Sequence, residues 1–111
     1  MSYDVSIADE WFNYTSNISA LFYDHFPNGR GLCGIDGMTG KQAVEEIGKA
    51  FANMNDTRHE LYQDGIPGEQ RMEAKYNAPN GWGSVVGALL FLGRIGAACA
   101  RHPRHKVSVD A

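Results

Sequence analysis

Residues 84–100 read SVVGALLFLGRIGAACA and carry one charge, that of Arg94. Small residues punctuate the bulky apolar ones, and Ser84 is a suitable N-cap for a helix over this run. A helix that is apolar on all sides must be enclosed by the rest of its chain or by a second copy of it. We therefore expect this helix to lie at the centre of the fold, covered by the other segments.

Both ends of the chain carry the alternating pattern of half-buried strands, over residues 3–8 and 106–110. The apolar side chains that fall on one face are Tyr3, Val5 and Ile7 in the first segment and Val107 and Val109 in the second. Strands at opposite ends of a chain most simply pair with each other. Because a two-stranded ribbon is only marginally stable alone, it has to pack on helices or be extended by another strand.

Helical patterns fill the middle of the chain. One helix is expected to begin at Thr15 or Ser16 and to end before Pro27. A second begins with a capping box formed by Thr39 and Gln42. Its apolar stripe comprises Ala43, Val44, Ile47, Ala50, Phe51 and Met54.

Shorter features separate these helices. The glycine-rich loop at 29–37 leaves room for a short strand at 32–35, and residues 55–57 look like a break followed by a new cap. Residues 69–76 suggest a short exposed helical turn or an ordered loop, and 77–81 a turn ahead of the long helix. These patterns predict an α+β fold: a compact, mostly helical single domain over 1–111, with a central apolar C-terminal helix and a short antiparallel β-ribbon pairing the N- and C-terminal strands.

Composition limits the classes of partner. The chain has 111 residues and a net charge of −3, and the basic excess of its C-terminal part is concentrated in the short run at 101–106. An acidic chain with so short a basic run is not expected to bind nucleic acids in general. That run follows a helix end, where cations interact favourably with the helix dipole. The apolar run is at the lower limit for crossing a bilayer, so no membrane association is expected. With no secretory signal, we expect a cytoplasmic protein whose two cysteines, Cys33 and Cys99, are reduced.

One candidate binding cluster is Asn13-Tyr14-Thr15-Ser16-Asn17. Two carboxamides bracket two hydroxyls at an expected helix start, where free backbone N–H groups favour an anion or a polar ligand. The cluster could hold a phosphate or the edge of a nucleotide. Equally, Thr15 or Ser16 caps the helix while the asparagines satisfy a nearby turn.

A second candidate is the turn that contains Asn80 and Trp82. Gly81 and Gly83 allow close approach by a ligand or a backbone, and Trp82 could stack on a ring or anchor a partner. The alternative is a turn with an N-cap from Asn80 or Ser84 and with Trp82 folded over the core.

Metal and catalytic chemistry have weaker support. Cys99, His102 and His105 are zinc-ligand types, but their spacing matches no known finger and Pro103 interrupts it, so no metal is expected. Cys33 could be combined with His25 or His59 and with Asp36 as a nucleophile, a base and an orienting group, yet the spacing does not favour this set. No nucleophile elbow, P-loop or dinucleotide fingerprint is present, so no cofactor is expected.

The sequence as a whole resembles a family of small proteins encoded by actinobacterial phages and their hosts. The segments that carry the likeness are Tyr3–Ile7, Asn13–Asn17, Asn80–Gly83 and the ending Cys99…His102-Pro103. The family has no assigned activity, so no catalytic residue can be transferred to this chain. The resemblance implies a protein made in the host cytoplasm, an accessory factor that binds a host protein or signalling molecule.

Three functional hypotheses follow. The leading one is a non-enzymatic binding module, a phage-type accessory or counter-defence protein that binds a host protein or a small polar or nucleotide ligand. Its binding residues would be Asn13, Tyr14, Thr15, Asn17, Asn80 and Trp82. The second is an enzyme acting on a nucleotide or another small polar substrate, with Asp36 or His59 beside the asparagines. The third is a structural homo-oligomer that associates through the apolar helix or a sheet edge.

Overall fold

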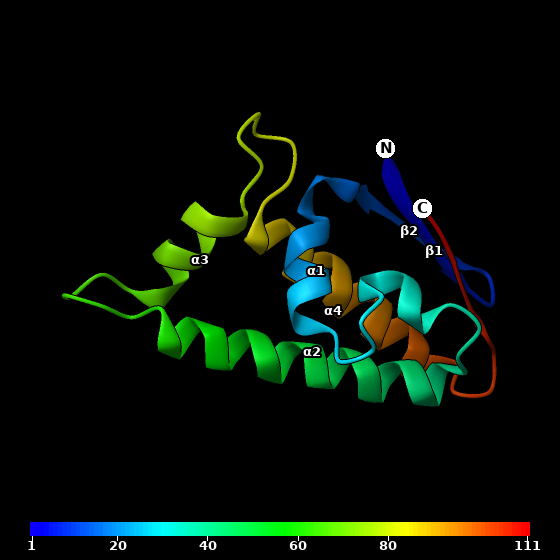
Figure 1. Ribbon diagram of the computed structural model, residues 1–111. Coiled ribbons are helices and arrows are strands. Elements are labelled where there is room, and N and C mark those ends of the chain that lie inside the picture. Colours follow the sequence, from blue (N-terminus) through cyan, green and yellow to red (C-terminus); the bar gives the residue numbers. More distant parts are fainter.

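The computed structural model describes all residues from 1 to 111. It has a three-stranded antiparallel sheet and four α-helices, in an α+β fold that confirms the predicted class (Figure 1). The strands are β1 (Ser2–Ile7), β2 (Glu10–Thr15) and β3 (Val107–Asp110), and the α-helices are α1 (Ser19–His25), α2 (Gly40–Glu60), α3 (Gly68–Tyr76) and α4 (Val85–Arg101). Two 3₁₀ helices, η1 (Ser16–Ile18) and η2 (Gly31–Ile35), flank α1.

The terminal strands pair as predicted, but the sheet contains one strand more. β1 lies between β2 and β3, and its register sets Val5 opposite Val109 and also opposite Phe12. β2 was not expected, because its polar residues resemble the cap of a helix. In a strand, however, alternate side chains point to opposite faces. Phe12 and Tyr14 pack on the core while Trp11 and Asn13 are exposed.

The expected helix start at residues 15–16 is correct only in part. The Thr15 hydroxyl accepts a hydrogen bond from the Asn17 amide, so Thr15 does act as a cap. It caps the single turn η1, which spans Ser16–Ile18, and α1 follows from Ser19. The glycine-rich loop also differs from the prediction, since residues 31–35 form η2 and not a strand. η2 lets the chain turn tightly while it buries Leu32 and Ile35 completely.

α2 is longer than predicted. Its capping box is present: the Gln42 amide donates to Thr39 Oγ1, and the Thr39 amide donates to Gln42 Oε1. The break expected at 55–57 is wrong, because the helix continues to Glu60. The Thr57 hydroxyl donates to the Asn53 carbonyl, a bond that a threonine makes from within a helix.

α3 is a true helix and not an exposed turn. Met72 and Tyr76 are buried, and the Tyr76 hydroxyl donates to Asp24 at 2.7 Å. Its first residue must be glycine, since a Cβ on Gly68 would lie 1.7 Å from the Arg58 carbonyl oxygen. The hairpin of α2 and α3 projects from the sheet and gives the molecule its elongated shape, 46 × 26 × 22 Å (Figure 1).

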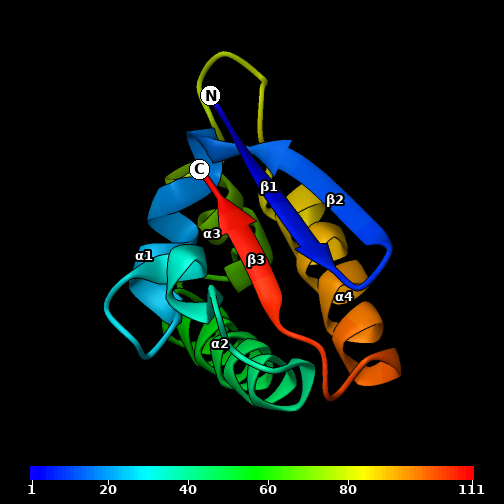
Figure 2. The ribbon, with the colours of Figure 1, turned by 90° about the vertical axis from the view of Figure 1, so that its right-hand side faces the viewer.

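α4 starts at Ser84, one of the two N-caps that the sequence allowed, and lies beneath the sheet. Seven of its residues are buried against the sheet and α2: Val85, Ala88, Phe91, Leu92, Ile95, Ala98 and Cys99. The rest of the chain covers only one side of this helix. Val86 and Leu90 are more than half exposed, and Figure 2 shows no element on the outer side of α4. No helix of the protein is long and apolar enough to cross a membrane.

The C-terminal end of α4 is tied to the sheet by charges. Glu10 of β2 accepts hydrogen bonds from the Arg101 guanidinium and, at 2.8 Å, from Nε2 of His102. The Arg101 hydrogen bond, followed by that of His102, lowers the pKa of the Glu10 carboxyl below its usual 4.5. The carboxylate of Glu10 therefore pairs with two residues of the basic run at 101–106, Arg101 and His102.

The turn between β1 and β2 offers a test of the strand assignment. Ala8 has a φ of +54°, a conformation that costs an L-residue about 1–2 kcal/mol and costs glycine almost nothing. We expect Ala8→Gly to raise the free energy of unfolding by about 0.5–1 kcal/mol, measured by urea denaturation. Ala20→Gly, within α1, is the matched control and should lower it by a similar amount. If Ala8→Gly also destabilises the protein, the assigned turn is wrong.

The Glu10 cluster predicts a specific loss of stability in acid. Because its folded-state pKa lies below the unfolded value, Glu10 contributes stability above pH 4.5, and this is lost as the pH falls through the folded-state pKa. Urea midpoints of wild type should therefore fall more steeply below pH 4.5 than those of Glu10→Gln. Parallel curves for the two proteins from pH 6 to pH 3 would contradict the pairing.

Candidate functional site

The two polar clusters recognised in the sequence meet in one open hollow. The first lies at the end of β2 and in η1, and the second lies in the turn ahead of α4, about 65 residues later. The residues that line the hollow are Met1, Ser2, Asn13, Tyr14, Thr15, Asn17, Gly81, Trp82, Gly83 and Ser84. Of the six residues predicted to bind a ligand, only Asn80 is absent from this lining, and it supports the turn from behind.

Direct hydrogen bonds join the two clusters. Asn17 Nδ2 donates to the Trp82 carbonyl at 3.0 Å. The Tyr14 hydroxyl accepts from the Ser84 amide at 3.0 Å and donates to the Ser84 carbonyl at 3.3 Å. Gly83 completes the junction, because its φ is +127° and a Cβ there would lie 2.9 Å from Thr15 Cγ2. The sequence could not reveal this junction, because it depends on the pairing of β2 with β1.

The turn holds the indole of Trp82 away from the core. Asn80 Oδ1 accepts a hydrogen bond from the Trp82 amide at 3.0 Å, which fixes the turn locally. Trp82 is 73% exposed, so it does not fold over the core. An aromatic ring of this size, held by a hydrogen-bonded turn and open to solvent, is suited to packing on a flat ring or on an apolar patch of another molecule.

The polar groups left free in the hollow include acceptors, the two asparagine amide oxygens, and donors, the Trp82 indole N–H and the hydroxyls of Ser2, Thr15 and Ser84. Asn13 Nδ2 donates to Asp4 and to the Tyr3 carbonyl, and Asn17 Nδ2 donates to Trp82, whereas neither amide oxygen has a partner in the chain. No lysine, arginine or acidic side chain lines the hollow. Two backbone N–H groups in the first turn of α4 also have hydrogen-bond partners. The Val85 amide donates to the Asn77 side chain, and the Gly87 amide donates to the Ser84 hydroxyl.

The residues considered for catalysis lie elsewhere. Asp36 accepts a hydrogen bond from the Val109 amide and so links η2 to β3. His59 is exposed near the end of α2, where its ring lies 3.4 Å from Arg58. His25 is buried, with Nδ1 donating to the Leu21 carbonyl and Nε2 bonded to Thr57, so its ring has a structural role. Cys33 is only partly buried in η2.

The weak zinc alternative is not assembled. Cys99 is fully buried, and burial, followed by the charge of Glu10, raises the pKa of its thiol, whereas a zinc ligand must be a thiolate. Nε2 of His102 is hydrogen-bonded to Glu10, and the ring of His105 packs edge-on against the ring of His102. Nowhere in the chain do three or more His, Cys, Asp or Glu side chains form a group that could hold a metal ion.

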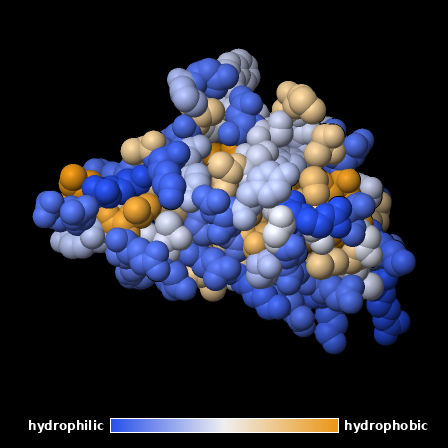
Figure 3. Space-filling model, in the orientation of Figure 1, coloured by the Kyte–Doolittle hydropathy of each residue, from blue (hydrophilic) through white to orange (hydrophobic).

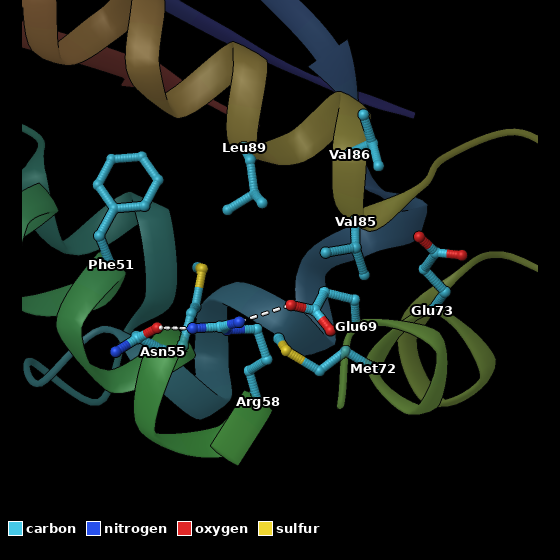
Figure 4. Close-up of a pocket in the computed structure, with 10 residues that line it drawn as sticks. Phe51, Asn55, Arg58, Glu69, Met72, Glu73, Val85, Val86 and Leu89 are labelled. Atoms are coloured by element: carbon cyan, nitrogen blue, oxygen red, sulfur yellow. Dashed lines mark hydrogen bonds and ion pairs between the residues drawn. The ribbon is translucent and has the colours of Figure 1, made fainter. Parts of the chain in front are cut away.

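A second concave feature, missed in the sequence, lies between α2, α3 and the start of α4 (Figure 4). It has a volume of about 230 Å³, and six of its ten lining residues are hydrophobic, among them Phe51, Met72 and Leu89. At its mouth Arg58 donates to Glu69 at 2.5 Å and to Asn55 at 2.6 Å. The pocket is therefore suited to an apolar group rather than a charged one. It could not be anticipated because α3 was expected to be exposed.

The face seen in Figure 3 contains no continuous apolar surface. Its apolar residues form separate spots within a mostly hydrophilic surface.

Removal of a single oxygen atom, that of the Tyr14 hydroxyl, tests the junction between β2 and the start of α4. Tyr14→Phe keeps the ring against Phe91, whose centroid lies 5.4 Å away, but removes both hydrogen bonds to Ser84. We expect a loss of about 1–2 kcal/mol in the free energy of unfolding and faster quenching of Trp82 fluorescence by acrylamide. Both are measured in a Trp11→Phe background. Tyr62→Phe, which alters an exposed ring, is the control; equal effects of the two changes would contradict the junction.

Comparisons with known proteins were made at three levels. No protein-family model matches the chain, and neither a curated protein nor a solved structure is significantly similar to it.

Proposed function

We propose that this protein is a small, non-enzymatic binding module that engages another protein through the hollow beside Trp82. The observation that carries the proposal is the meeting of two polar clusters around a tryptophan that is 73% exposed. Tryptophan is enriched among the residues that dominate the energy of protein interfaces. Here the chain uses four hydrogen-bonding side chains, Tyr14, Asn17, Asn80 and Ser84, to hold the tryptophan turn in place.

The chemistry of the hollow favours a protein over a ligand that carries phosphate. Phosphate is bound by cationic side chains or by free N–H groups at a helix N-terminus. The hollow has no lysine or arginine, and two N–H groups in the first turn of α4 are already bonded to side chains. The amide oxygens of Asn13 and Asn17 are free to accept hydrogen bonds, and the Trp82 indole N–H and the hydroxyls of Ser2 and Thr15 are free to donate them. The partner should therefore present both donors and acceptors, as a polypeptide backbone does, around an apolar contact for Trp82.

The resemblance to small phage proteins supports the same proposal. It implies an accessory factor that binds a host protein or a host signalling molecule, and the chemistry of the hollow favours the first of these. The enzymatic alternative has less support, because neither Asp36 nor His59 lines the hollow that holds the asparagines. We therefore assign no catalytic residue.

The test starts from cells in which the protein is naturally made. Tagged wild type, Trp82→Ala and Trp11→Ala are used to capture partners, and the captured protein is then produced separately and titrated by calorimetry. Trp11 is a matched control, because it is 63% exposed but lies in β2, outside the hollow. We expect Trp82→Ala to weaken binding by about 30-fold or more, corresponding to about 2 kcal/mol, and Trp11→Ala to change it less than threefold.

Two outcomes would contradict the proposal. One is a partner whose affinity is unaffected by Trp82→Ala. The other is saturable quenching of Trp82 fluorescence by a nucleotide, accompanied by its turnover, which would favour the enzymatic alternative.

A further inference from the structure

The outer side of the α2–α4 pair is an uncovered apolar surface. We define the α2–α4 face by its exposed or partly exposed residues, which are Val44, Gly48 and Phe51 on α2 and Val86, Leu90, Gly93 and Ala97 on α4. The two helices are antiparallel neighbours, since the start of α2 at Gly40 touches the end of α4 at His102, and Phe51 and Leu89 line the same pocket. No member of the face is charged, but exposed charged residues border it, Lys41 and Glu45 on α2 and Arg94 on α4.

The glycines of this face have no explanation within the chain. A Cβ on Gly48 or on Gly93 would meet no atom within 4 Å, so neither glycine is needed for packing inside the molecule. Glycine in the interior of a helix is less stable than alanine. Two such residues beside exposed valine and leucine side chains therefore indicate that another surface approaches these helices closely.

We propose that a second copy of this chain docks on the α2–α4 face. Bulk is distributed unevenly along the exposed side of α4: Val86 and Leu90 occupy its first half, and Gly93 and Ala97 its second half. When two copies of α4 pack antiparallel about a two-fold axis, Leu90 lies over Gly93 of the second copy and Val86 over its Ala97. Large side chains then meet small ones along the whole contact, as a self-complementary interface requires.

The size of the face agrees with a specific but weak dimer. α4 has 17 residues and is about 25 Å long, and two helices packed about 10 Å apart present a surface about 20 Å wide. Two copies would thus bury on the order of 1,000 Å², the lower limit for a specific interface. We expect dissociation in the micromolar range. This inference is independent of the proposed function, because Trp82 lies in the turn before α4 and outside the face.

Sedimentation equilibrium of the full chain from about 1 to 500 µM tests the proposal. Wild type should pass from monomer to dimer within this range. Gly93→Gln should raise the dissociation constant at least tenfold, because the new side chain would clash with Leu90 of the second copy, while the monomer keeps its helical circular dichroism and its Tm does not fall. Ala20→Gln, on α1 and away from the face, should leave the dimer unchanged.

A cross-link tests the register directly. In a Cys33→Ser background, Val86→Cys combined with Ala97→Cys should give a covalent dimer on mild oxidation, and neither change alone should do so in comparable yield. A monomer throughout the concentration range would overturn the proposal. A dimer that is insensitive to Gly93→Gln would also overturn it, because the contact would then lie elsewhere.

Discussion

The architecture depends on the burial of one side of α4. Seven of its residues are enclosed by the sheet and α2, and Phe91 among them contacts both Tyr14 of β2 and Phe22 of α1. Removing apolar surface from water is the main favourable term in folding, and α4 carries the most apolar run of this chain. Each neighbouring element presents its apolar face to α4 or to the core that α4 completes. The position of this helix therefore determines where the strands and the tryptophan turn lie.

The hollow beside Trp82 is a consequence of that arrangement. Because Tyr14 packs on Phe91, its hydroxyl reaches the backbone of Ser84 and joins the end of β2 to the start of α4. Most polar side chains of the two clusters take part in this junction, and the groups that remain for a partner include the indole ring of Trp82 and two amide oxygens. In Asn13 and Asn17 the amide nitrogen thus has a structural role, because it donates within the chain, while the amide oxygen is left for a partner.

Local signals in the sequence were sufficient for the class of fold, the capping box at Thr39, the Ser84 cap and the pairing of β1 with β3, since each depends on neighbouring residues or on simple alternation. β2 was missed because a short polar strand resembles a helix cap until its partner is known. α3 was taken as exposed because only Met72 and Tyr76 reach the core. The six candidate binding residues were recognised as two separate groups, and only tertiary packing brings five of them to one surface.

The α2–α3 hairpin has a further consequence for dynamics. It projects from the main body, and α3 is anchored to that body chiefly by Met72 and by Tyr76 with its bond to Asp24. With so few buried anchors, α3 is expected to open at a lower free energy than the sheet and α4, and its amides are expected to exchange with solvent sooner. Its detachment would expose the apolar walls of the pocket in Figure 4 without global unfolding.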